Sequence, residues 1–193
     1  MKKRLVIVAL LVIGIAILSA GTIAYFTSQD TAHNVITSGG VKITLDEWMD
    51  EVGGTPYPAK PVEVMPGTSV TKIVTVKNQD ADAWVRARFD VIIRNKDGQE
   101  VKPENHEEAV QIACSSKWIS EGDWYYYADA LSAEEITEPL FSEVVFDGPS
   151  MTDEYQNCTV EVIVYAQAVQ SANNGTGALD AAGWPSFTPP TNP

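Results

Sequence analysis

The residue types that could do chemistry in this chain are two histidines, two cysteines and many carboxylates. His33, His106, Cys114 and Cys158 lack the close spacing at which zinc ligands recur, so the sequence does not predict a metal site. The stretch "NHEEA" around His106 lacks the second histidine of the zinc-protease motif H-E-x-x-H. We therefore expect neither a metal nor a cofactor.

Nucleophilic and acid–base catalysis are equally unsupported. The chain contains no G-x-S-x-G, P-loop or G-x-G-x-x-G motif. A Ser-His-Asp triad would need His33, near the N-terminus, or His106, in a polar segment. With 26 acidic residues, some pair of carboxylates will lie close together in any fold, so such a pair is uninformative. We predict no catalytic residues and a protein that is not an enzyme.

The two cysteines leave two alternatives open. In an exported protein, Cys114 and Cys158 could form a disulfide that closes a loop of about 40 residues, worth about 3–4 kcal/mol on the loop-entropy model. Alternatively, they are two buried free thiols. The spacing does not distinguish these two states.

The N-terminus has the pattern of an export signal. Met1-Lys2-Lys3-Arg4 is followed by a span from Leu5 to Ala24 without a charged residue. A basic segment before an apolar one is typical of a signal peptide, although this span is also long enough to cross a bilayer as a helix. Signal peptidases require small residues at the first and third positions before the cut, which Ala24 and Thr22 satisfy. We predict cleavage between Ala24 and Tyr25.

Loss of residues 1–24 would remove three cations and no acid, so the net charge would change from −13 to −16. Such a surface repels nucleic acid and anionic membranes. We therefore expect no nucleic-acid partner and no membrane attachment after cleavage.

Behind the leader, apolar residues alternate with polar ones at the period of half-buried strands. We expect strands at 41–45, 69–78, 83–94, 138–148 and 158–170, and a hairpin at 117–129 that turns at Glu121-Gly122-Asp123. Residues 103–113 ("PENHEEAVQIA") are the only mid-chain helix candidate. Six or more short strands with little helix predict an all-β fold, an antiparallel β-sandwich.

Two groups of side chains on these strands invite a functional interpretation. Arg86, Arg88 and Arg94 share one face of their strand and could bind an anion, although such a row more often is solvated or pairs with acids across the sheet. The aromatic cluster Trp118, Trp124 and 125–127 could bind sugar, although sandwich cores are the commoner place for such rings. The Pro-rich tail, 171–193, is expected to be loose beyond one short helical turn.

Three stretches resemble the TasA/camelysin family. "GTIAYFTSQDTAHNVITSGGVKITL" (21–45) is similar to that family's export signal and first strand. "MPGTSVTKIVTVKNQDADAWVRARFDV" (65–91) is similar to its Pro-Gly turn and the two strands that follow, and "VEVIVYAQAVQ" (160–170) to its final strand. The likeness is weak across 95–155 and in the tail.

This resemblance implies a jelly-roll-like sandwich, processing by a dedicated signal peptidase of the SipW kind, and secretion to the extracellular matrix or cell surface. It also implies a bacterial biofilm-matrix fibre that grows by donor-strand exchange between copies of the chain, with accessory matrix proteins as further candidate partners. The boundaries that follow are 1–24 for the signal peptide, 25–38 for the arm, 39–170 for the sandwich and 171–193 for the tail.

The arm is compatible with an extended donor strand because it contains no proline and only one acid, Asp30. Its apolar or β-branched residues include Tyr25, Phe26, Thr27, Val35, Ile36 and Thr37. Two alternatives remain: a camelysin-like cell-surface peptidase, for which the chain shows no metal motif, and a monomeric adhesin that binds glycan through its aromatic cluster.

Overall fold

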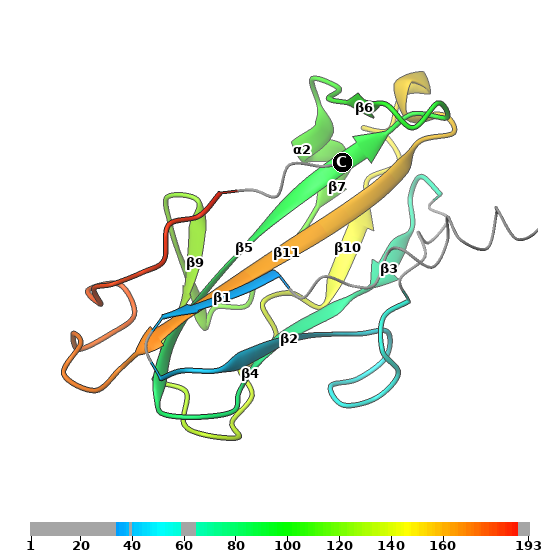
Figure 1. Cartoon of the computed structure of the whole chain (residues 1–193). Coiled ribbons are helices and arrows are strands. Elements are labelled where there is room, and N and C mark those ends of the chain that lie inside the picture. The colour runs from blue at the N-terminus through cyan, green and yellow to red at the C-terminus, as the bar shows by residue number, and fades with distance from the viewer. Residues whose placement is uncertain (1–33, 39, 59–64, 189–193) are drawn as a thin grey trace, which may run out of the picture. The chain divides into compact units, whose positions relative to one another are not determined.

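The computed structural model describes residues 34–38, 40–58 and 65–188, with only the backbone of 34–38 (Figure 1). The predicted leader, the cleavage site at Ala24 and Tyr25, and the arm residues Phe26 and Thr27 lie outside the described residues. Within the described residues, no helix is long and apolar enough to cross a bilayer.

The larger sheet is built around two twelve-residue strands, β5 (Ala83–Arg94) and β11 (Thr159–Gln170), which pair antiparallel over their full length (Figure 1). β9 (Trp124–Tyr127) and β8 (Trp118–Glu121) follow on the β5 side, and β6 (Glu100–Val101) pairs with the end of β5. β1 (Asn34–Ser38) lies on the other side, beside β11.

The second layer consists of short strands joined by hydrogen-bonded loops. β2 (Ile43–Trp48) pairs antiparallel with β4 (Ile73–Asn78), while β10 (Glu143–Phe146) pairs with β3 (Ser69–Thr71) and β7 (Val110–Gln111). Residues 134–142 extend β10 along the free side of β4, with bonds such as Leu140 N–H to Val74 O at 2.8 Å. The β2–β4 pair and the β3–β10–β7 sheet thereby form one continuous layer.

A single apolar core joins the two layers. Alternate residues of β5 and β11 face inward, and Val85, Ala87, Ala166 and Ala168 are fully buried there. These small residues at the centre of the long pair share one core with Val74 of the opposite layer. The core confirms the predicted all-β antiparallel sandwich, which is not closed into a barrel.

Turn chemistry follows the sequence. Pro66 and Gly67 occupy the central positions of a turn in which Thr68 N–H donates to Met65 O, and Gly67 has φ +78°, which glycine adopts without strain. Gly122 (φ +59°) opens the two-residue loop of the β8–β9 hairpin, as predicted.

Three expectations need correction. The helix expected at 103–113 is a single turn, α2 (His106–Ala109), because Val110 leaves helical geometry to pair with Phe146. The strand expected at 69–78 is interrupted at Lys72, and its halves pair with different partners. The tail is not loose up to residue 188, since it packs on the larger sheet through Trp184.

Candidate functional site

One candidate site is the edge of the larger sheet where the N-terminal segment pairs. β1 runs parallel to β11 with Asn34 opposite Tyr165 and Ser38 opposite Val169. Parallel pairing is the exception here, because every other strand pair in the described residues is antiparallel. The predicted arm residues Val35, Ile36 and Thr37 are therefore brought to this edge by their backbone.

β1 covers only the second half of β11. From Thr159 to Ile163, β11 pairs with β5 alone among the described strands. The inward-facing Val160 and Val162 of this half are only partly buried, whereas Val164 is 2% exposed. The core is thus less well covered next to Thr159–Ile163, the half of β11 that β1 does not reach.

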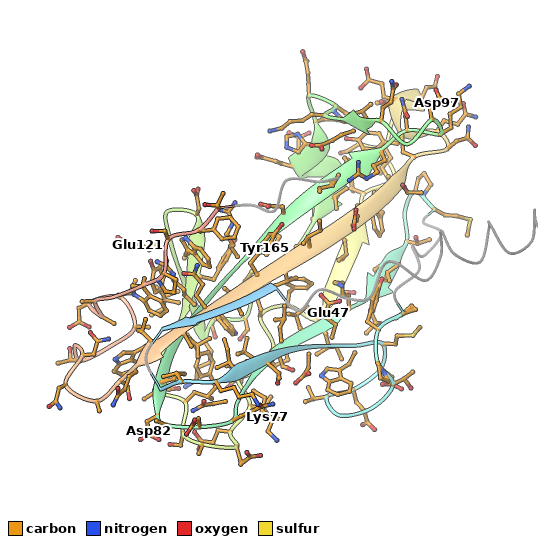
Figure 2. The ribbon with its side chains drawn as sticks, in the orientation of Figure 1. Glu47, Lys77, Asp82, Asp97, Glu121 and Tyr165 are labelled. Carbon is orange, nitrogen blue, oxygen red and sulfur yellow. The ribbon has the colours of Figure 1, made fainter. Side chains whose placement is uncertain are left out.

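An ion pair lies near this uncovered half. Lys72 Nζ is 2.5 Å from Glu47 Oε2, and the lysine side chain is only 7% exposed (Glu47 is labelled in Figure 2). Burial lowers the pKa of Lys72, and the Glu47 and Glu161 carboxylates oppose that shift. The Tyr57 ring covers the ammonium at 4.1 Å from its centroid, and burial raises the pKa of the Tyr57 phenol. The pair holds β2 to the β3–β4 junction.

A second candidate site is the outer face of the larger sheet, where arginines and aromatic rings alternate. The Arg86 guanidinium stacks between the rings of Trp124, at 4.2 Å, and Trp184, at 4.6 Å. It also donates two hydrogen bonds to Gln167 Oε1, at 3.0 and 2.7 Å, and one to the Tyr126 hydroxyl at 3.2 Å. This arginine is therefore neither solvated nor part of an exposed anion site.

Arg88 occupies the next row of the same face. Its guanidinium lies 4.6 Å from the Phe187 ring and bonds Asp90 at 2.9 Å. Phe187 also contacts Tyr165, which is labelled in Figure 2, at a centroid distance of 4.9 Å. Arg94 pairs more loosely with Glu161 at 3.8 Å, which agrees with the expectation that these arginines meet acids across the sheet.

The aromatic cluster divides between the two faces because strand side chains alternate. Trp118 and Tyr127 are buried in the sandwich core with ring centroids 5.1 Å apart. Trp124 and Tyr126 face outward, where Phe187 and Trp184 cover them. The described structure therefore presents no open platform of these rings.

Three buried nitrogen donors on this outer face lack a hydrogen-bond partner among the described residues. They are Arg88 Nε, Gln167 Nε2 and Trp184 Nε1. A buried donor without an acceptor normally costs about 1–3 kcal/mol. The contact between the tail and the sheet is therefore well packed but incompletely hydrogen-bonded.

The cysteines are free thiols in this structure. Cys158 Sγ–H donates to Glu154 O at 3.3 Å, whereas the Cys114 thiol bonds the Tyr125 hydroxyl. Burial raises the pKa of both thiols. Both side chains are partly buried against the core, and the Cys114–Cys158 disulfide of an exported protein stays a prediction.

No metal-binding group of His, Cys, Asp and Glu side chains occurs among the described residues. His106 Nδ1 lies 3.0 Å from Pro103 O, and this turn borders an open hollow whose lining includes Lys102 and Glu154. The arrangement offers no nucleophile with an adjacent base.

Comparisons with known proteins add nothing to these observations: no family model, no curated protein and no solved structure matches the chain.

Sequence reasoning missed the residues that organise both candidate sites. Lys72 and Glu47 are 25 positions apart, and nothing local predicts that they pair. Trp184 and Phe187 did carry a signal, because large aromatic residues are unusual in a tail of small and polar residues.

Proposed function

We propose that this protein is a secreted structural subunit of extracellular, biofilm-matrix fibres, which grow by donor-strand exchange of the N-terminal arm. The observation that carries the proposal is the position of β1. It is an edge strand from the N-terminal side of the domain, and it pairs with β11 alone among the described strands. Such a strand can leave its sheet without disrupting the remaining ladder.

In the exchange, β1 of one copy leaves its own β11 and pairs with β11 of another copy. The two segments in contact stay the same, but they now belong to different subunits. Domain swapping of an identical element loses no contact, and a head-to-tail contact that does not close on itself propagates as a filament. The chain would turn between Ser38, which still belongs to β1, and Val41, which is already buried in the core; the sequence has two glycines between them. The partly covered half of β11 offers further edge to a longer incoming arm.

The alternatives receive less support. A glycan platform would need exposed rings, but Trp124 and Tyr126 are covered by the tail. A metallopeptidase would need a ligand set, and the described residues hold none. The edge position of β1 is the observation that supports the fibre subunit.

The test is a disulfide placed across the β1–β11 contact. Ser38 and Val169 are opposite each other, and paired positions of adjacent strands lie within disulfide range. Ser38→Cys and Val169→Cys are introduced into the chain that starts at Tyr25, with Cys114 and Cys158 changed to serine. Fibres are grown under reducing conditions and then oxidised, and the products are run on a non-reducing denaturing gel.

We expect a ladder of covalent multimers, because each new bond would join two subunits. Oxidation of the monomer before assembly should instead lock β1 in its own sheet and block growth until a reductant is added. The matched control pairs Ser38→Cys with Ser120→Cys on β8, at the opposite end of the sheet, and should give no ladder. Fibres that yield only monomeric bands after oxidation would show that the arm is not exchanged. Failure of the reduced protein to form fibres would remove the proposed function.

A further inference from the structure

The tail segment Trp184-Pro185-Ser186-Phe187, here called the strap, is the red segment beside β9 in Figure 1, and its two rings pack on outward-facing rings of the larger sheet. Trp184 stacks on Arg86, and Phe187 packs against Arg88, Trp124 and Tyr165. Trp, Tyr and Arg are the residue types enriched among the binding hot spots of protein interfaces, and a ring over a guanidinium plane is an attractive contact. The strap therefore fills a recognition surface built by β5, β9 and β11.

The chain before the strap is firmly attached. The Asn174 side chain bridges Gln170 O and Ala182 O and accepts from Ala182 N–H, while Trp84 Nε1 donates to Asn174 O at 2.7 Å. Ala178 is buried against Trp84 in a small second core. Residues 171–182 thus form a closed loop that stays on the domain whether or not the strap is seated.

The strap itself is held differently. Across 183–188, the only hydrogen bond that the described structure shows to the sheet is a long one, from Arg86 to Pro185 O at 3.4 Å. Gly183, with φ +79°, joins the fixed loop to the strap in a conformation that other residues rarely adopt. Two donors of the surface, Arg88 Nε and Gln167 Nε2, and one of the strap, Trp184 Nε1, have no partner among the described residues. The strap is therefore a side-chain-anchored segment on a glycine hinge, without a backbone ladder to hold it.

We propose that the strap is exchangeable and that the surface beneath it also receives the strap of a second copy of this chain. The occupant follows from the structure, because the surface already fits this sequence and every copy carries it. Exchange between identical segments sacrifices no contact. The contact lies on the face of the sheet, so it would join subunits side by side and does not depend on exchange of the N-terminal arm.

The surface does not favour an anionic polymer as its partner. The guanidinium planes of Arg86 and Arg88 lie against aromatic rings, and Arg88 also bonds Asp90. The chain around them carries a net charge of −13. Planar aromatic side chains are therefore the best-matched ligands, and the strap supplies two of them, Trp184 and Phe187.

The test uses a fluorescein-labelled peptide of residues 183–193 ("GWPSFTPPTNP") and fluorescence anisotropy. The full chain carrying Trp184→Ala and Phe187→Ala has an unanchored strap and should bind the peptide saturably. Wild type should bind it about tenfold or more weakly, because its own strap occupies the surface. Adding Arg86→Gln to the double variant should weaken binding by about tenfold or more.

A second measurement concerns whole chains. Sedimentation of wild type mixed with the double variant should show a heterodimer that the variant with added Arg86→Gln does not form. Near-UV circular dichroism establishes that each variant is folded. If the double variant does not fold, Phe187→Ala alone replaces it under the same criteria, since Phe187 lies outside the small second core.

Absence of saturable peptide binding to a folded variant, or binding that Arg86→Gln leaves unchanged, would overturn the proposal. Monomers alone in the mixed sample would overturn it as well. Fibre growth is measured separately. Fibres without strap binding would contradict only this inference, whereas strap binding without fibres would contradict only the proposed function.

Discussion

Glu47→Gln should destabilise the sandwich strongly, because it removes the charge that compensates Lys72. The lysine side chain is 7% exposed and its partner 19% exposed, with 2.5 Å between Nζ and Oε2. Breaking a buried ion pair by removing one partner typically costs about 3–5 kcal/mol. Since Glu47 retains some contact with water, we expect the lower end, about 3 kcal/mol, against a total of about 5–15 kcal/mol for a typical domain.

The assay is urea unfolding of the purified domain, together with its melting temperature. For a domain of this length, a loss of about 3 kcal/mol corresponds to a drop of about 6–12 °C. Glu134→Gln is the matched control, since the Lys77–Glu134 pair has a similar 2.6 Å separation but side chains 32% and 70% exposed. That change should cost about 1 kcal/mol at most.

Lys72→Met, added to Glu47→Gln, separates loss of the pair from loss of packing. It removes the uncompensated ammonium and leaves an apolar chain of similar length, so the double variant should recover most of the lost stability. Equal unfolding midpoints for Glu47→Gln and Glu134→Gln would refute the reasoning. The same conclusion would follow if the double variant were no more stable than Glu47→Gln alone.

Three other outcomes are expected. Val164→Asp should lower the free energy of unfolding by several kcal/mol because the Val164 side chain is 2% exposed. Val162→Asp should lower it less, since Val162 is only partly buried. Unfolding midpoints measure both losses, and equal losses would contradict the burial assigned to the two positions. Burial lowers the pKa of Lys72 below its ordinary 10.5, so the unfolded chain holds more protons at alkaline pH. This residue should therefore make the free energy of unfolding rise from neutral pH toward pH 10, an increment that urea titrations of Lys72→Met should lack. N-terminal sequencing of exported protein should begin at Tyr25 if Ala24 is the last residue of the signal peptide; Met1 on surface protein would mean a retained anchor.

The strands with a clear two-residue period could be predicted from the sequence, and so could the tight turns. In β11, alternate residues from Val160 to Ala168 are apolar, and they face the core as expected. Gly122 marked the β8–β9 turn for a local reason, because the loop needs a positive φ there. Both signals depend only on residues near each other in the chain.

Predictions failed where partners distant in sequence determined local structure. Residues 103–113 contain good helix formers, but Val110 gains more by pairing with Phe146 than by extending a helix. The strand through Lys72 is divided because its halves meet different neighbours, β10 and β2. The intrinsic preference of a residue for helix or strand contributes little free energy, so pairing with a distant strand overrides it.

For the two candidate sites, the sequence by itself determined which residues share a face: the arginines of β5 and the apolar row of β11. Only the tertiary structure decided that Arg86 lies between Trp124 and Trp184, that Lys72 meets Glu47, and that β1 runs parallel to β11. Alternation along a strand is imposed by the backbone of that strand, whereas a contact across a sheet or with the tail depends on which segments the burial of the whole core brings together.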